Sequence, residues 1–294
     1  MQPLDYCRQA EADRQIFAPV SMLFPTEKRD MLMVLDVFCG ELRRLVREHS
    51  DVSVAQAALN WRRADLVKAF AGENAEHPPH QALAEMAPKY GLPYREFADI
   101  LDGTETDLKQ MRYTDGDWLM QYCSRVYGAA WRLAARIAGA DDENSLHTAE
   151  QYGTAARLTE ILRDVGKDAR AGRIYLPMNE MQQFGVPAAD ILRGNATPQF
   201  AALMAGRITQ VQNLFYRAAA MPSADKAVRR PLDILAALFY ALLQEIAHDG
   251  AQNVLKYTLA IPKPRRTRII WKTRLFGFKP RAAEMFSNNQ KNSK

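Results

Sequence analysis

Three carboxylates stand four residues apart in one stretch of the chain: Glu160, Asp164 and Asp168. Apolar residues of the same stretch recur at helical spacing, which predicts a helix over 144–171. A spacing of four places the carboxylates on one face of that helix, one turn above another. The negative charges of such a row repel one another unless cations lie beside them. Mg²⁺ that holds a phosphate is one such cation, because it binds through one or two carboxylates and phosphate oxygens.

Another interpretation of the row needs no metal. The basic residues Arg157, Arg163 and Lys167 stand in the same stretch and can pair with its acids on a solvated helix. Arg163 is also suited to bind phosphate, since a planar guanidinium can donate two parallel hydrogen bonds. The spacing alone leaves a metal–phosphate site and an ion-paired, solvated helix both open.

The stretch Leu162–Pro177, LRDVGKDARAGRIYLP, resembles the second aspartate-rich signature of the squalene/phytoene synthase family. That family condenses prenyl diphosphates head to head. In it, the residues aligned with Asp164 and Asp168 hold Mg²⁺, and the arginine aligned with Arg163 contacts diphosphate. The resemblance therefore implies catalytic, metal-binding roles for this aspartate pair, and it extends over about residues 4–260.

Other segments resemble the same family. The run Tyr122–Val126, YCSRV, resembles the helix that lines its prenyl pocket, which implies a catalytic role for Tyr122. The resemblance also implies that Arg173, Tyr175 and Phe17 contact substrate. The family is all-α, so we expect an isoprenoid-synthase-like helical bundle around a deep apolar cavity, with two aspartate-rich helices facing each other at its mouth.

The first of those two motifs is degenerate in this chain. After the residue aligned with Cys39, the family has an arginine and then a D-D-x-x-D-like cluster. Here Gly40 replaces the arginine, and Arg43 and Arg47 stand in the two metal-ligand places. A guanidinium stays protonated and has no acceptor atom, so it cannot ligate Mg²⁺. We therefore expect at most one Mg²⁺ site, a weak one on the second motif.

Three interpretations of Arg43 and Arg47 remain open. They bind diphosphate directly through bidentate bonds, they pair across the cavity mouth with the acidic row, or they form a solvated face. Each leaves the two-substrate condensation impaired, because ionising an allylic diphosphate requires metals and cationic groups around the leaving charge. The sequence thus predicts a prenyl diphosphate-binding protein, by resemblance a prenyltransferase. The alternatives are a single-substrate prenyl diphosphate hydrolase or a non-catalytic protein that binds an isoprenoid lipid or a protein partner.

The charge of the chain is unevenly distributed. Residues 251–294 carry eleven Lys or Arg and one acidic residue, a net +10, so the rest of a chain whose total is +5 carries −5. We expect a synthase-like domain over 1–260 and a basic, amphipathic tail over 261–294, with disorder over 282–294. Cations mixed with Ile, Trp, Leu and Phe favour contact with a membrane surface. A helix docked on the body is the alternative, and no motif supports nucleic-acid binding.

Periodicity and turn signals predict further helices, and the pair His77 and His80 around a diproline predicts a break. No apolar run reaches the 18 residues of a membrane span. Three cysteines without metal-ligand spacing favour reduced thiols in a cytoplasmic protein, associated at most with the inner face of a membrane. The other expected helices cover 1–16, 27–48, 53–72, 80–90, 93–110, 115–139, 198–220 and 229–249, with two short helices within 178–194 that are separated at 185–187.

Overall fold

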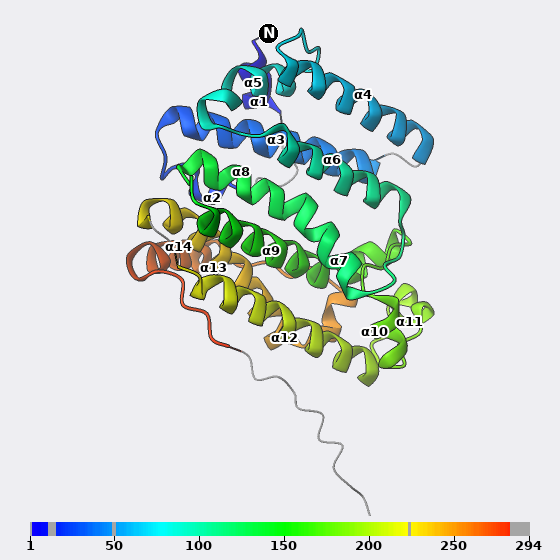
Figure 1. Cartoon of the computed structure of the whole chain (residues 1–294). Helices are drawn as coiled ribbons and strands as arrows, with labels where there is room; N and C mark the ends of the chain where they lie inside the picture. Colours follow the sequence, from blue (N-terminus) through cyan, green and yellow to red (C-terminus); the bar gives the residue numbers. More distant parts are fainter. Residues whose placement is uncertain (1, 11–15, 49–50, 223–224, 283–294) are drawn as a thin grey trace, which may run out of the picture.

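The computed structural model describes residues 2–10, 16–48, 51–222 and 225–282, and these form helices joined by turns (Figure 1). The strand-like pairing among them is one isolated bridge, between Arg112 and Ile174. The predicted all-α class is therefore confirmed. No helix in the described ranges combines the length and hydrophobicity that crossing a bilayer requires.

The helices follow one another with short connections. The first half of the chain holds α1 (Pro3–Gln9), α2 (Ala18–Ser21), α3 (Thr26–Glu48), α4 (Val52–Ala71), α5 (Pro78–Met86), the 3₁₀ helix η1 (Ala87–Tyr90), α6 (Tyr94–Lys109), α7 (Gly116–Cys123), the π-helix η2 (Ser124–Gly128) and α8 (Ala129–Ala138). The second half holds α9 (Glu143–Arg170), α10 (Met178–Gln183), α11 (Ala188–Arg193), α12 (Pro198–Ala220), α13 (Lys226–Asp249), the 3₁₀ helix η3 (Ala251–Leu255) and α14 (Lys263–Phe276).

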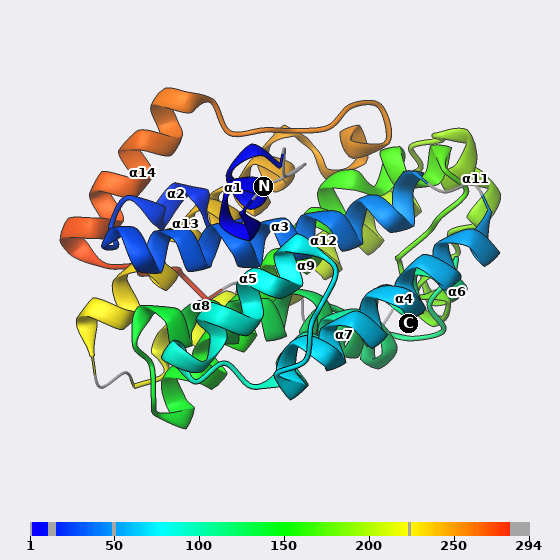
Figure 2. The same ribbon diagram turned by 90° about the horizontal axis from the view of Figure 1, so that it is seen from above.

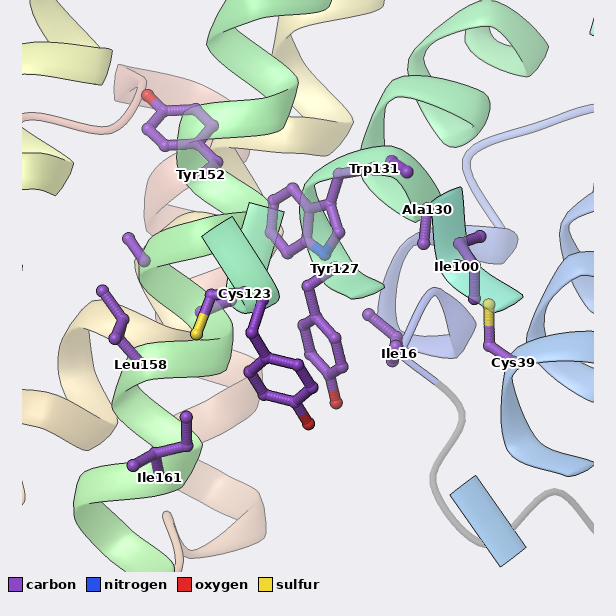
Figure 3. Packing of buried hydrophobic residues seen from close by; sticks show 14 of the residues in the cluster. Ile16, Cys39, Ile100, Cys123, Tyr127, Ala130, Trp131, Tyr152, Leu158 and Ile161 are labelled. Atoms are coloured by element: carbon purple, nitrogen blue, oxygen red, sulfur yellow. The ribbon is translucent and has the colours of Figure 1, made fainter. Parts of the chain in front are cut away.

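Helix α9, which carries the acidic row, is the central element of the bundle. It packs against α8, α12, α13 and η2, and most of its residues are buried. Figure 3 shows its Leu158 and Ile161 on one side of Tyr127 and Trp131, with Ile16 on the other side. A helix that is surrounded by neighbours is expected to be apolar on most faces. Helix α9 nevertheless buries the acidic residues Glu160 and Asp164 within the body of the protein.

The single helix expected over 115–139 is interrupted. Residues 124–128 form a turn of π-helix, which separates α7 from α8. This turn lies very close to α9, because a Cβ on Gly153 would stand 2.5 Å from the carbonyl oxygen of Tyr127. π-Turns inside helices often occur at functional sites, and both Tyr122 and Tyr127 line the cavity described below.

Two other expectations about the first half need correction. The diproline does not prevent a helix: Pro78 and Pro79 occupy the first turn of α5, between His77 and His80. The first-turn N–H groups of a helix have no partner within it, so proline loses nothing there. The helix expected over 1–16 ends at Gln9, and residues 11–15 lie outside the described ranges.

The C-terminal helix is docked on the body at one end of the bundle, beside α13 and α2 (Figure 2). Arg230 of α13 donates to the carbonyl oxygen of Thr273 at 3.0 Å, and Arg265 pairs with Glu245. Beyond α14, the ring of Phe278 packs among aromatic rings of the core. The disorder expected over 282–294 falls, apart from one residue, outside the described part of the chain.

Two glycines inside helices give a matched test of this packing. A Cβ on Gly166 of α9 would stand 2.5 Å from the carbonyl oxygens of Val254 and Leu255 in η3, whereas the nearest atom to a Cβ on Gly206 of α12 would be 3.8 Å away. We expect Gly166→Ala to lower the free energy of unfolding by about 2 kcal/mol through overpacking. Gly206→Ala should raise it by about 1 kcal/mol through helix propensity.

Urea denaturation of both variants measures the difference. Equal stabilities would show that η3 does not lie against α9 as closely as described.

Candidate functional site

A cavity of about 470 Å³, here called the central cavity, lies among α3, α6, α7, η2 and the second half of α9. Its wall is mixed, with apolar side chains such as Leu42, Ile100 and Val126 beside many polar ones. The charged and phenolic side chains on the wall are Arg43, Arg47, Asp107, Tyr122, Tyr127, Arg157, Glu160, Asp164, Lys167, Asp168, Arg173 and Tyr175.

The central cavity brings together most of the site residues that the sequence predicts. They come from four separate segments of the chain, and the resemblance alone placed them in one site. Their roles in binding or catalysis stay predictions. The predicted residues on the wall are Arg43, Arg47, Tyr122, Asp164, Asp168, Arg173 and Tyr175.

Arg163 faces away from the wall of the central cavity and clamps its neighbour in the sequence. Its Nε and Nη2 donate to the two carboxylate oxygens of Asp164, at 2.7 and 2.6 Å. Both groups are buried, and a charged hydrogen bond in such surroundings is strong. Each oxygen of Asp164 therefore already accepts a hydrogen bond from a cation on its own helix.

Glu160 is satisfied in a similar way. It is 4 % exposed, lies 3.6 Å from Arg157 and 3.5 Å from Arg163, and accepts a 2.5 Å hydrogen bond from the hydroxyl of Tyr127. Among the described residues, an ion pair within 4 Å from Arg43 to the acidic row is not formed. Burial lowers the pKa of Arg43, but the neighbouring Tyr127, Cys39 and Glu160 together raise it above its ordinary value.

In the described part of the chain, Glu160 and Asp164 pair with arginines of α9 itself, whereas one of the three interpretations from the sequence paired the acids of α9 with the arginines of α3. The reason is distance along a helix, because residues three apart lie on one face. Arg157 and Arg163 each stand three residues from Glu160. Arg47, at the end of α3, directs its Nε to the carbonyl oxygen of Arg43 at 3.3 Å.

A buried network centred on Asp107 was not predicted from the sequence. Its carboxylate accepts hydrogen bonds from the hydroxyls of Tyr122, at 2.9 Å, and Tyr175, at 2.5 Å. Arg173 donates to its carbonyl oxygen at 2.6 Å. Burial and the charge of Asp107 raise the pKa values of both tyrosines well above the ordinary range, although Arg157 lowers them, so both stay protonated. The one available signal was the pair Asp107-Leu108, which resembles part of a segment in the middle of the family's sequence.

Arg157 is the second feature of the site whose role was not predicted from the sequence. Its guanidinium carbon lies 5.4 Å from the ring centres of Tyr122 and Tyr175 and 5.8 Å from that of Tyr127. Its Nη2 donates to the hydroxyl of Tyr122 at 2.8 Å. A guanidinium over aromatic faces is attracted by the ring quadrupoles, so three tyrosines and one hydrogen bond fix this cation in the cavity.

The magnesium site that the second motif implies is poorly supplied with ligands. Both oxygens of Asp164 accept from Arg163. Burial raises the pKa of Asp168 to about 7; Arg157 lowers this pKa and the charge of Asp164 raises it. Within the described ranges, no group of three or more His, Cys, Asp or Glu side chains could hold a metal. The donor set therefore does not fit a cluster of metal ions.

Phe17, a predicted substrate contact, lies in the core. Its side chain is fully buried and meets the ring of Trp131 edge-on, with centroids 6.4 Å apart. The backbone N–H groups of Ile16 and Phe17 donate to the carboxylate of Asp36 at 2.8 and 3.1 Å. Burial raises the pKa of Asp36 to about 7, against the lowering effect of Arg43 and these N–H groups. Phe17 is not among the residues that line the central cavity, and its contact with substrate stays a prediction.

A smaller pocket of about 330 Å³ lies on the other side of Glu160. Its wall is mostly apolar, with Leu235, Leu238 and Phe239 of α13, and Arg163 and Arg266 add charge. Glu160 lines both cavities. The expected deep apolar space is therefore present as two adjoining cavities in the described part of the chain, and the larger one has a mixed wall with charged and phenolic groups.

Known structures of similar shape support the predicted fold. A squalene synthase, HpnC, from Alicyclobacillus acidocaldarius superposes with a TM-score of 0.75 at 26 % identity and covers 84 % of this chain and 94 % of its own. A dehydrosqualene synthase crystallised with a ligand superposes with a TM-score of 0.81 at 23 % identity, covering 93 % and 96 %. The isoprenoid-synthase-like helical bundle is confirmed.

Sequence relatives agree. A 15-cis-phytoene synthase of Synechococcus elongatus is 32 % identical over 226 residues, which are 72 % of this chain and 73 % of that protein. A chloroplastic phytoene synthase of Narcissus pseudonarcissus is 30 % identical over 247 residues, 80 % of this chain and 57 % of that protein. The chain thus spans about three fifths of the length of such plant relatives. The family model for squalene/phytoene synthase matches residues 11–267, and the chain therefore belongs to the squalene/phytoene synthase family.

Proposed function

We propose that this protein binds the diphosphate of a prenyl diphosphate in the central cavity and is impaired in joining two such substrates. Family members are prenyltransferases and generally depend on divalent metals. The observation that carries the proposal is that Arg43 and Arg47 line the same cavity as Asp164 and Asp168. Two arginines stand where the family pattern places metal-binding carboxylates.

The chemistry of guanidinium explains both halves of the proposal. Arginine binds phosphate oxygens in a bidentate way, so the cavity keeps groups that attract a diphosphate. It has no acceptor for a metal, and the carboxylate of Asp164 is engaged by Arg163. We infer at most one weak Mg²⁺ site, on Asp164 and Asp168. Condensation requires two allylic diphosphates in one active site, and one carboxylate motif supplies half of the expected metal ligands.

Two outcomes remain within this proposal. In one, the bound prenyl diphosphate is hydrolysed: its carbon–oxygen bond breaks, water adds to the carbon, and a prenyl alcohol and inorganic diphosphate leave. In the other, the protein binds the lipid without chemistry, alone or with a protein partner. The clamp of Arg163 on Asp164 favours the second outcome, because a metal must displace a buried ion pair to bind there.

Incubation with farnesyl or geranylgeranyl diphosphate and Mg²⁺ tests the proposal. We expect binding of one equivalent and no squalene- or phytoene-like product, and released diphosphate distinguishes hydrolysis from binding alone. Arg43→Gln with Arg47→Gln should weaken binding about tenfold, the usual worth of one charged hydrogen bond. Arg193→Gln, at an exposed position of α11, is the control. Efficient formation of a condensed hydrocarbon would overturn the proposal.

A second proposal concerns α14 and an anionic membrane surface. One face of this helix is docked through Ile270 and the buried Thr273. The opposite face carries Trp271 and Leu275, 56 % and 65 % exposed, with the guanidinium of Arg274 5.5 Å from the centre of the Trp271 ring. Apolar side chains flanked by cations are typical of helices that lie in the headgroup region. We infer peripheral association with the inner face of a membrane.

Vesicle sedimentation tests this second proposal without removing the docked helix. We expect co-sedimentation with vesicles rich in phosphatidylserine, weakened by salt, because each cation near the surface contributes about 1 kcal/mol. Trp271→Ala with Leu275→Ala should reduce the bound fraction, whereas Trp118→Ala, an exposed tryptophan on α7, should not. Equal sedimentation of all three proteins would exclude α14 as the contact.

A further inference from the structure

Arg157 has unusual surroundings for a charged side chain. It lines the central cavity, yet three tyrosine rings surround its guanidinium within 6 Å and hold it there. Its one ion pair among the described residues is loose, at 3.6 Å to Glu160. Glu160 in turn accepts a shorter bond from Tyr127. The cation is thus fixed by aromatic faces more than by an opposite charge.

The tyrosines that hold Arg157 are themselves fixed. The hydroxyls of Tyr122 and Tyr175 donate to Asp107, and Tyr127 donates to Glu160. Phenols and arginines therefore donate to three of the four carboxylates of the wall, those of Asp107, Glu160 and Asp164. A preorganised cation of this kind loses little freedom when it binds an anion.

The charged side chains on the wall of the central cavity also favour an anionic ligand. Five cationic side chains and four carboxylates line the central cavity. Asp107, Glu160 and Asp164 each accept hydrogen bonds from described residues. Lys167 is exposed at the rim, within the same lining. A metal would have to displace protein donors, whereas a polyanion finds cations on the wall.

We propose that the central cavity is a metal-independent site for a polyanion of the diphosphate class, and that Arg157 is its fixed central cation. The inference rests on the proposed function, in which the same cavity receives the headgroup of a prenyl diphosphate, and it names what replaces the metals. The position of Arg157 also affects how well the cavity could stabilise a carbocation. The tyrosine faces that could stabilise a carbocation already hold a guanidinium, and a second cation beside it would be repelled.

Calorimetric titration of the full-length protein with inorganic diphosphate tests the inference. We expect binding in EDTA, with an affinity that excess Mg²⁺ changes by less than about threefold, a shift of under one decade in Kd. Arg157→Gln should weaken binding about tenfold, since one charged hydrogen-bonding group is lost. Arg157→Lys keeps the charge without the planar fork and should lie between the two.

Three further measurements make the result unambiguous. Arg193→Gln, distant from the cavity, should bind like the wild type. Circular dichroism shows whether Arg157→Gln is folded. If it is not, Lys167→Gln at the exposed rim serves instead, with an expected loss of about threefold for a single exposed charge. Orthophosphate should bind more weakly than diphosphate, because it bridges fewer cations.

The outcomes separate this inference from the proposed function. Binding of inorganic diphosphate that disappears in EDTA would overturn the inference and leave a prenyl diphosphate site that needs metal. Unchanged affinity in a folded Arg157→Gln protein would overturn the role of Arg157. If inorganic diphosphate binds in EDTA while farnesyl diphosphate binds no better than farnesol, the inference stands and the proposed function fails.

Discussion

The compensation of buried carboxylates on α9 is the constraint on which the site depends. Glu160 and Asp164 are 4 % and 7 % exposed, and a buried charge without a partner costs several kcal/mol. Cations must therefore stand within hydrogen-bonding distance. Arg163, three residues from Glu160 and next to Asp164, supplies that charge to both. Because Arg163 lies on the same helix, this part of the charge compensation does not depend on a neighbouring helix or on a ligand.

The helix that faces α9 across the cavity differs in charge from the family pattern. The bundle brings α3 and α9 to one cavity, as the family resemblance implies, but α3 presents Arg43 and Arg47 instead of carboxylates. Two arginines cannot share metal ions with the acids of α9. In the proposed function, guanidinium groups take the place of the family's metal chemistry in this cavity. Arg157, held by three tyrosines, places one of these groups deep in the wall.

Much of the fold follows from local pattern. The helix that carries the acids was predicted over 144–171 and lies at 143–170, because long helices with strong periodicity leave a clear signal. The start of α5 was predicted wrongly, since two prolines were taken as a break although the first turn tolerates them. The π-turn in 124–128 follows from the close approach of two backbones at Gly153, which no window of sequence displays.

The site was predicted from the sequence only in part. The resemblance placed Arg43, Asp164 and Tyr122 in one site, and the structure puts them on one wall. It did not indicate the Asp107 network, whose bond to Tyr175 joins residues 68 apart in the sequence. It also did not indicate that α9 would satisfy its own acids. Such contacts depend on side-chain directions in the assembled bundle, which composition and spacing do not encode.

The most direct measurement of this account is the thermal unfolding midpoint as Mg²⁺ is added in the absence of any phosphate. A metal that binds only the folded state raises the midpoint increasingly as its concentration exceeds its Kd. Because Arg163 already engages both carboxylate oxygens of Asp164, the account predicts a midpoint that stays unchanged up to millimolar Mg²⁺, with Ca²⁺ at equal ionic strength as the control. A midpoint that rises with Mg²⁺ and not with Ca²⁺ would show that Asp164 binds the metal in preference to Arg163, and would contradict the account.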